Sequence, residues 1–289
     1  MNLMKFRPLF LIISSLLILT SLFSIIKWNF KYSEDFIGGA TFEVKMPNLK
    51  NQQELEKIFA DNQITVRSIS TNSGQYTVKL LNINQDQKLK LESSMKLIDK
   101  DTEILQFSSV GPSLGKELIQ KTIIAVILAS LSLLIFIGSR FNDVSFGASA
   151  ILAMFHDTFI LIGAFSLLGH FFGAELDSLF VTALLTTLSS SVHDTVVTFD
   201  RIRELKRKNF KVEWVNLANQ AVSEVIVRSI NNSMTIIFML LALVVLGGAS
   251  TRWFAVALLI GVVCGTYSST AVAIPLVLFW KKLQSKKAK

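Results

Sequence analysis

Long apolar runs dominate the pattern of hydrophobic and polar positions along this chain. Three runs contain no charged residue, at 8–26, 122–139 and 253–280. Three others are of similar length but carry ionisable residues within them, at 144–169, 178–199 and 225–247. A bilayer core about 30 Å thick takes about 20 apolar residues to cross as a helix, so the pattern predicts six transmembrane helices.

The segment between the first two runs has the pattern of a folded domain outside the membrane. Alternating positions predict strands at 41–46, 65–70, 75–81 and 103–110, and helical spacing predicts helices at 52–60 and 85–98. This βαββαβ order is typical of a ferredoxin-like domain, a four-stranded antiparallel sheet with two helices on one face. The predicted fold class is a polytopic α-helical membrane protein with an α+β extracytoplasmic domain between helices 1 and 2.

Glycines mark both boundaries of this domain. Gly38 and Gly39 precede the first predicted strand, and Gly111, Pro112 and Gly115 follow the last one. Glycine reaches backbone conformations with positive φ and allows another segment to approach closely, and proline stiffens a turn. We expect these residues to form joints between the domain and the membrane helices.

The composition and charge agree with a membrane protein. Of the 289 residues, 51% are hydrophobic and 17% are charged, whereas soluble domains carry about 25% charged residues. The chain has 29 Lys and Arg against 21 Asp and Glu, and the basic residues concentrate near the N-terminus, at 201–211 and at 281–289. The positive-inside rule places these segments, and both termini, in the cytoplasm, next to anionic lipid rather than nucleic acid.

The same patterns divide the chain into four parts. The first apolar run exceeds the core of a signal peptide, about 7–15 residues long, so we interpret it as an uncleaved span. The predicted parts are a cytoplasmic N-terminus with the first transmembrane helix at 1–28, an extracytoplasmic α+β domain at 29–117, a five-helix transmembrane bundle at 118–280 with a cytoplasmic loop at 200–221, and a basic cytoplasmic tail at 281–289.

Small residues recur in the sixth run. Gly261 and Gly265 are four residues apart and are followed by Ser269. In a membrane, small residues at this spacing let two helices approach closely. We expect this face to pack against another span rather than to form a binding site.

Two residues of opposite charge lie inside the membrane runs. Asp194 precedes Asp200 by six residues, which puts it about 9 Å inside the fourth run, and Arg228 lies at a similar depth in the fifth. A charge at the bilayer centre costs about 2.5–3.5 kcal/mol on insertion scales, so each is a candidate functional residue. A carboxylate beside a movable cation acts as a proton switch, whereas a fixed ion pair only joins two helices. The residues themselves leave both interpretations open.

Polar residues accompany each charge at helical spacing. They are Thr187, Ser190 or Ser191, and Thr198 with Asp194, and Asn231 or Asn232, and Thr235 with Arg228. Such stripes form hydrogen bonds between helices or line a hydrated crevice, and both uses keep the charges away from lipid. We expect both stripes to face the interior of the bundle.

The tripeptide His-Asp-Thr occurs twice, at 156–158 and at 193–195. His193 adjoins Asp194 and is a candidate to modulate its proton, although adjacent residues on a helix point in different directions. His156 and Asp157 are either a second relay point or a hydrogen-bonded helix contact. A metal site needs further His, Asp or Cys ligands, and the chain has three His and one Cys in all, so we expect no metal and no cofactor.

Four motifs, in order along the chain, resemble the SecF family. They are DFIGG at 35–39, VGPSLG at 110–115, HDTVVTFDRIRE at 193–204 and RSINNSMT at 228–235. SecF is the smaller subunit of the SecDF protein-export complex, in the resistance-nodulation-division superfamily. The chain departs from the family pattern at Ser189 and Ser190, where the family usually has Gly-Tyr, and at His193, which is often Asn.

The resemblance implies a function. It implies a non-enzymatic accessory subunit of the Sec preprotein translocase in the bacterial inner membrane, which uses the proton-motive force with SecD to promote export. It places Asp194 and Arg228 on the proton pathway of the family, and makes SecD, SecYEG, unfolded preprotein and lipids the partners. The alternatives are a structural partner subunit without its own proton coupling, and a proton-coupled exporter of small molecules or lipids.

Overall fold

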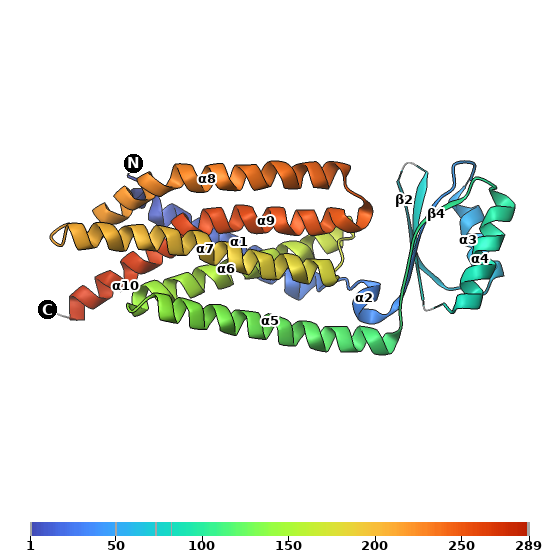
Figure 1. Ribbon diagram of the computed structural model, residues 1–289, viewed down its shortest axis with the longest axis horizontal. Coiled ribbons are helices and arrows are strands. Elements are labelled where there is room, and N and C mark those ends of the chain that lie inside the picture. The colour runs from blue at the N-terminus through green and yellow to red at the C-terminus, as the bar shows by residue number, and fades with distance from the viewer. Residues whose placement is uncertain (1, 50, 73, 82, 288–289) are drawn as a thin grey trace. The chain divides into compact units, whose positions relative to one another are not determined.

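The computed structural model describes residues 2–49, 51–72, 74–81 and 83–287. The chain separates into two compact units. One is Tyr32–Ile123, and the other combines Met1–Lys31 with Ile124–Lys289. Figure 1 shows the elements of both along the chain.

The larger unit is helical. Its elements are η1 (Leu3–Phe6), α1 (Arg7–Trp28), the C-terminal part of α5 (Pro112–Arg140), α6 (Val144–Phe172), α7 (Ser178–Lys208), α8 (Trp214–Leu246), α9 (Ala249–Ala271) and α10 (Ala273–Lys287). Five helical stretches of the described chain are long and apolar enough to cross a membrane: Leu3–Trp28, Ser113–Arg140, Val144–Phe172, Trp214–Leu246 and Thr251–Lys286. The chain is therefore a mostly helical protein with several potential spans.

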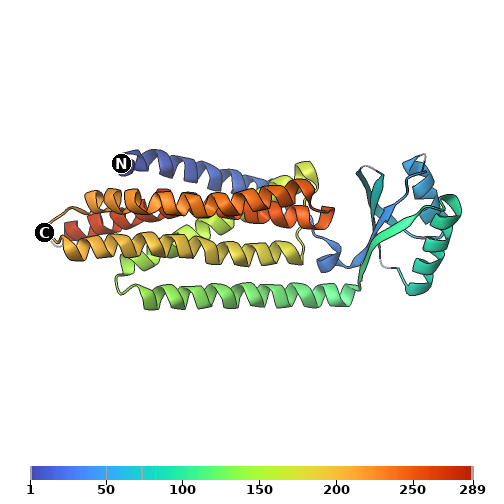
Figure 2. The same cartoon turned by 45° about the horizontal axis from the view of Figure 1, so that its top comes forward.

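Helix α7 corresponds to the remaining predicted span. It has 31 residues, which makes it about 46 Å long at 1.5 Å per residue. It falls outside the five apolar stretches because polar and ionisable residues occupy much of its sequence. Figures 1 and 2 show α7 running along the helical unit with α8 and α9. The predicted loop at 200–221 is mostly helical, since α7 continues to Lys208 and α8 begins at Trp214.

The last predicted span is divided into two helices. α9 ends at Ala271 and α10 begins at Ala273, with Val272 between them. Pro275 explains the break, because it has no N–H to donate to the carbonyl of Ala271 and its ring crowds that carbonyl. The uncharged run predicted one span, and Thr251–Lys286 is long and apolar enough to form one, but the run did not predict the interruption at Val272.

The basic segments gather at one end of the helical unit. Figure 1 shows both termini and the α5–α6 and α7–α8 connections at this end. Ion pairs join the segments there, from Lys281 to Asp143 and from Arg140 to Asp200. The arrangement agrees with the charge distribution from which the sequence analysis predicted a shared side for both termini.

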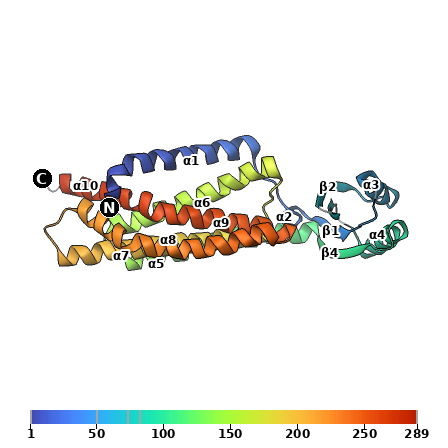
Figure 3. The same cartoon turned by 90° about the horizontal axis from the view of Figure 1, so that it is seen from above.

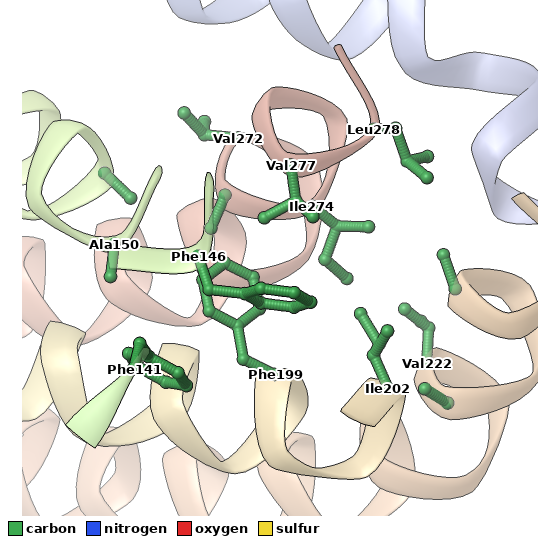
Figure 4. Packing of buried hydrophobic residues seen from close by; sticks show 14 of the residues in the cluster. Phe141, Phe146, Ala150, Phe199, Ile202, Val222, Val272, Ile274, Val277 and Leu278 are labelled. Atoms are coloured by element: carbon green, nitrogen blue, oxygen red, sulfur yellow. The ribbon is translucent and has the colours of Figure 1, made fainter. Parts of the chain in front are cut away.

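An apolar cluster fixes the same end. Phe141, Phe146 and Phe199 contact one another, with the ring centroids of Phe146 and Phe199 5.1 Å apart. Figure 4 shows these rings beside aliphatic side chains of α7, α8 and α10, including Val222 and Ile274. The cluster packs α6, α7, α8 and α10 against one another at this end, closer to the two termini than Asp194 and Arg228 are.

Glycines bring helices close together elsewhere in the unit. A Cβ on Gly261 of α9 would overlap the side chain of Thr187 on α7, and one on Gly265 would lie 3.4 Å from the Cα of Ser191. The predicted close packing of the Gly261 and Gly265 face is confirmed. Gly163 of α6 makes a similar contact with Ser21 of α1; Figure 3 shows these two helices.

The smaller unit is an α+β domain. Its elements are α2 (Glu34–Ile37), β1 (Gly39–Lys45), α3 (Gln52–Asp61), β2 (Val66–Asn72), β3 (Gln75–Leu80), α4 (Gln85–Ile98) and β4 (Glu103–Val110), followed by the start of α5. The sheet is antiparallel with the order β2-β3-β1-β4. Helices α3 and α4 lie on one face of it (Figure 1), and Phe42, Val78, Leu55 and Leu91 are among the side chains buried between them. The predicted βαββαβ element order is confirmed.

Asp99 joins the segment that follows β1 to the segment that precedes β4. Its carboxylate accepts hydrogen bonds from the backbone and side-chain nitrogens of Asn48, at 3.0 and 3.1 Å, and from the backbone nitrogen of Asp101 at 3.0 Å. Burial raises the pKa of Asp99, but the hydrogen bonds from Asn48 and Asp101 outweigh it, so the pKa lies below its ordinary value. The ionised form therefore stabilises the fold.

We expect Asp99→Ala to loosen the domain selectively. The hydrogen bonds of Asp99 stabilise the folded state fully above the ordinary aspartate pKa of about 3.9, and this contribution is lost as the pH falls through the lower folded value. Hydrogen exchange of β1 and β4 in the full chain, corrected for intrinsic rates, should accelerate in this variant at neutral pH. The exposed Asp61 supplies the control Asp61→Asn. Equal protection in Asp99→Ala and the unaltered chain would contradict the prediction.

Candidate functional site

Asp194 lies on α7 where this helix packs against α8. Its side chain is half-buried, and its Oδ2 accepts a hydrogen bond from the Oγ of Ser229 on α8, at 3.3 Å. Arg228 is the residue before Ser229, so the structure brings the two predicted proton-pathway residues to neighbouring positions on adjacent helices.

The two charged groups do not form an ion pair. Both residues lie in the described chain, and neither a hydrogen bond nor an ion pair joins Asp194 to Arg228; the arginine is exposed. The reason is the rotation of α8, since neighbouring helical residues point about 100° apart and Ser229 is the one that faces Asp194. The ion pair that their similar depth on consecutive helices makes possible is therefore not present among the described residues.

Arg228 instead lines a groove between α7 and α8. The groove has a volume of about 570 Å³. Its lining is charged over much of its length and consists of Val197, Asp200, Arg201, Glu204, Glu224, Val225 and Arg228. Arg201 forms ion pairs with both Glu204 and Glu224 and so connects the two helices across the groove. Arg228 lies at its inner part, because it is the lining residue of α8 farthest from the basic end.

The polar stripes of the two helices have different surroundings. On α7, Thr187, Ser191 and Thr198 are buried, as predicted. On α8, Asn231, Asn232 and Thr235 are exposed, and the prediction that this stripe faces inward is wrong for this chain alone. The cause is position in the bundle: α7 has α6, α8 and α9 around it, whereas much of the surface of α8 has no neighbour in the described chain.

His193 is exposed on α7. No hydrogen bond of its ring is found in the described part of the chain. Its predicted influence on the proton of Asp194 stays a prediction.

His156 and Asp157 on α6 form a buried polar site in the helical unit. Asp157 on α6 is 1% exposed, and its Oδ2 accepts hydrogen bonds from Ser191 of α7, at 2.6 Å, and Ser268 of α9, at 2.5 Å. Its Oδ1 lies 2.9 Å from Nδ1 of His156, which is also buried. The pair makes a hydrogen-bonded contact that joins three helices, and its role as a second relay point stays a prediction.

Ser268 is the residue of this site that the sequence analysis missed. The small-residue spacing drew attention to Ser269, which instead donates a hydrogen bond to the carbonyl of Thr266 on its own helix. The signal was present, because Gly261, Gly265 and Ser268 follow one another at spacings of four and three residues and so share a face.

Metal ligands are not assembled in this region. Across the described ranges, no group of three or more His, Cys, Asp or Glu side chains is placed to hold a metal ion. Asp157 has one histidine and two hydroxyl groups around it, and Asp194 has one hydroxyl group. The predicted lack of a metal site stays a prediction.

The glycines before β1 are required by the backbone. Gly38 and Gly39 have φ values of 76° and 145°, in the region that side chains disfavour. A Cβ on Gly39 would also lie 2.8 Å from the carbonyl oxygen of Leu80 on the adjacent strand. These residues make a tight turn into the sheet, and their movement as a joint stays a prediction.

The predicted joint after β4 has one closely packed residue. A Cβ on Gly115, in the first turn of α5, would lie 2.8 Å from the carbonyl oxygen of Phe36 in α2. Gly111 has open space around it and is not among the glycines with positive φ. Pro112 is the first residue of α5, where a proline is well tolerated, and its side chain lies outside the described part.

Comparison with known proteins identifies the family. The family model described as protein export membrane protein SecD/SecF, C-terminal, matches residues 90–283. The chain belongs to the SecD/SecF family. Protein translocase subunit SecF of Thermobaculum terrenum is 37% identical and covers 97% of this chain and 94% of its own length. Protein translocase subunit SecF of Haemophilus influenzae is 34% identical and covers 94% of this chain and 83% of its own length.

Family members also include chains in which the two subunits are fused. Protein translocase subunit SecDF of Thermus thermophilus is 33% identical over 88% of this chain, which corresponds to 35% of the fused protein. The crystal structure of SecDF from Thermus thermophilus matches with a TM-score of 0.85 and 30% identity, and this chain spans 39% of that one. A SecDF structure described as the super-membrane-facing form matches with a TM-score of 0.68. The SecD/SecF fold therefore extends over nearly the whole of the present chain.

Proposed function

We propose that this chain is the SecF subunit of a Sec protein translocase, an accessory component that works with SecD and the proton-motive force to promote protein export. Relatives named as SecF align over nearly the full length, and the fused SecDF relative supports SecD as a partner. One observation carries the proton-coupling part: Asp194 is half-buried and hydrogen-bonded to Ser229 where α7 packs against α8, and Arg228, the residue before Ser229, lines a charged groove between the same two helices.

In this proposal Asp194 is the group that takes up and releases the proton. An ionised Asp194 accepts the hydrogen bond of Ser229, whereas a protonated one can donate, so each proton changes the contact between α7 and α8. Arg228 favours the ionised state when it approaches, and its exposed side chain is free to move in the groove. One charge crossing 100 mV is worth about 2.3 kcal/mol, which is enough to shift such a contact repeatedly.

We further propose that α7 is a sixth span and that both termini are cytoplasmic, in the bacterial inner membrane. The length of α7 and its packing among α6, α8 and α9 support the span, because neighbouring helices keep its polar residues out of lipid. The gathering of Lys and Arg at one end of the helical unit supports the orientation.

The smaller unit is, in this proposal, a ferredoxin-like domain that contacts unfolded preprotein outside the membrane. Its element order and its sheet order β2-β3-β1-β4 support the fold name. Because its relatives are named as protein translocase subunits, we place the chain among transport components that act beside SecYEG.

SecD is expected to cover the exposed polar stripe of α8. Asn231, Asn232 and Thr235 lie in a helix apolar enough to span a membrane, and lipid offers them no hydrogen bonds. Asn232→Leu should therefore reduce the SecD that co-purifies with the chain. A hydrogen bond between membrane helices is worth about 0.6–2 kcal/mol, which predicts a loss of about three- to thirtyfold in affinity.

The control for this variant is Leu241→Ala. Leu241 is 42% exposed on the same helix and lies nine residues after Asn232, half a turn away from it, so its replacement should leave SecD binding unchanged. Equal recovery of SecD with Asn232→Leu and Leu241→Ala would show that SecD does not cover the stripe.

The proposed function is tested in vesicles that contain SecYEG, SecD and this chain. We expect export of a preprotein to increase when the chain is present, and an ionophore that collapses the proton gradient to remove the increase. An increase that survives the ionophore would reject proton coupling and leave the structural-partner alternative. No increase under either condition would reject the role in export.

A further inference from the structure

The proposed mechanism uses Asp194 and leaves the more deeply buried carboxylate without a role. Asp157 is 1% exposed at the meeting of α6, α7 and α9, and its neighbour His156 is 6% exposed. The packing of α9 against α7 through Gly261 and Gly265 brings Ser191 and Ser268 to it. The site is therefore built by three helices and closed to solvent.

The charges around Asp157 do not balance without a proton. Of the elements packed against α6, α1 carries charged residues only near its ends, and α10 carries them from Lys281 onward. α7 carries His193, Asp194 and a charged segment at 200–208, and α9 carries Arg252, Cys264 and Tyr267. Within the described ranges, no Lys or Arg forms an ion pair with Asp157. A buried carboxylate without a cation is strongly disfavoured, so one proton shared with His156 is the available counter-charge.

The other titratable groups on these helices are turned elsewhere. Asp194 accepts its hydrogen bond from Ser229 on α8, and His193 is exposed. The hydroxyl of Tyr267 donates to the carbonyl of Phe10. Among the described residues, His156 is the titratable side chain hydrogen-bonded to Asp157, so the proton balance of Asp157 depends on His156.

The hydrogen bonds allow a proton to be accepted without breaking the site. Ser268 Oγ lies 2.5 Å from Asp157 Oδ2 and 3.3 Å from the carbonyl oxygen of Gly265. When the carboxylate is ionised, the serine hydroxyl donates to it. When Oδ2 of Asp157 carries a proton, the Oγ of Ser268 can accept a hydrogen bond from it. The serine hydroxyl then donates its own hydrogen to the carbonyl of Gly265 instead.

His156 has the complementary property. Its Nδ1 faces Asp157, while its Nε2 is buried and has no hydrogen-bond partner in the described structure. The shared proton can therefore lie either on Nδ1 of His156 or on Oδ1 of Asp157. The hydroxyl of Thr195, one turn after Ser191 on α7, is also buried and unpartnered.

We propose that His156 and Asp157 form a second proton-binding site in the helix bundle, separate from Asp194, with Ser191 and Ser268 as its hydrogen-bond partners. Its use in export rests on the proposed function, but the binding of the proton does not. Asp194 on α7 is then hydrogen-bonded to α8, whereas Asp157 on α6 is hydrogen-bonded to α7 and α9.

Infrared difference spectroscopy on the purified full chain tests the site directly. A protonated carboxyl group has a C=O band that the ionised group lacks, and we expect a pH-dependent band that Asp157→Asn removes. In Asp194→Asn this band should persist. Loss of the band in Asp194→Asn with its retention in Asp157→Asn would overturn the proposal, as would the absence of any band that depends on Asp157.

A second pair of variants covers the case in which Asp157→Asn does not fold. Ser268→Ala removes a donor to the carboxylate and should move the pH midpoint of the band by about one unit or more. Ser269→Ala is the matched control, since it removes a buried hydroxyl whose hydrogen bond, in the part of the chain that the structure describes, goes to the carbonyl of Thr266. Equal midpoints in the two variants would overturn the proposal. Because no measurement here involves export, failure of the proposed function would leave its result unchanged.

Discussion

Asp194→Asn is expected to abolish the proton-dependent part of export while the chain still inserts in the membrane and binds SecD. Asparagine has nearly the shape of aspartate and can keep a hydrogen bond with Ser229, so the contact between α7 and α8 remains. It cannot take up a proton, so the contact no longer changes with the gradient. The measurement is preprotein export in vesicles with and without a proton gradient.

Glu204→Gln is a suitable control for this variant. Glu204 also lies on α7 and lines the groove, but it is 47% exposed and pairs with Arg201 and Lys208 at the surface. Surface ion pairs contribute about 0–1 kcal/mol, so export should change little. Full gradient-dependent export with Asp194→Asn would reject the coupling role and favour a purely structural subunit.

Gly163→Leu is expected to have the largest effect on the stability of the bundle. A Cβ on Gly163 would overlap both the side chain and the backbone of Ser21, so α1 has to move away from α6. Two further contacts join the same face of α6 to the end of α1. The Oγ of Ser166 donates a hydrogen bond to the carbonyl of Asn29 at 2.7 Å, and the ring of His170 stacks on that of Trp28 with 4.6 Å between their centroids. Overpacking costs about 1–3 kcal/mol and occasionally more.

Thermal unfolding in detergent, compared with Gly138→Leu, provides the measurement. Gly138 lies in α5, and a Cβ there meets nothing within 4 Å. We expect a clear loss of stability for Gly163→Leu and none for Gly138→Leu. Similar melting of both variants would mean that α1 does not depend on its contact with α6.

The sequence predicts elements better than the rotation of helices about their axes. Uncharged runs and alternation locate most helices and all four strands, because burial in lipid or in a sheet imposes the pattern directly. The side chain that α8 turns towards α7 depends on which neighbours surround it. For this reason the spacing predicts Arg228 opposite Asp194, whereas the structure places Ser229 there.

The structure differs from the prediction in two other places, because the length of an uncharged run does not show where a helix breaks or ends. Pro275 divides the last span at Val272 although no charge interrupts the run. Helices α7 and α8 extend past the apolar residues into the predicted loop, since Arg, Lys and Glu are good helix formers at a water-exposed end. The buried site at Asp157 needs three helices to meet, and sequence spacing on one helix reveals only one side of it.

The interruption at Val272 gives the two halves of the last span separate attachments. α9 is held to α7 by small residues and reaches Asp157 through Ser268, whereas α10 is anchored in the apolar cluster by Ile274 and to Asp143 by Lys281. Pro275 donates no backbone hydrogen bond across the interruption, so the chain bends more easily at Val272 than an unbroken helix would. The two halves of the span are therefore fastened to different helices on either side of a weak point.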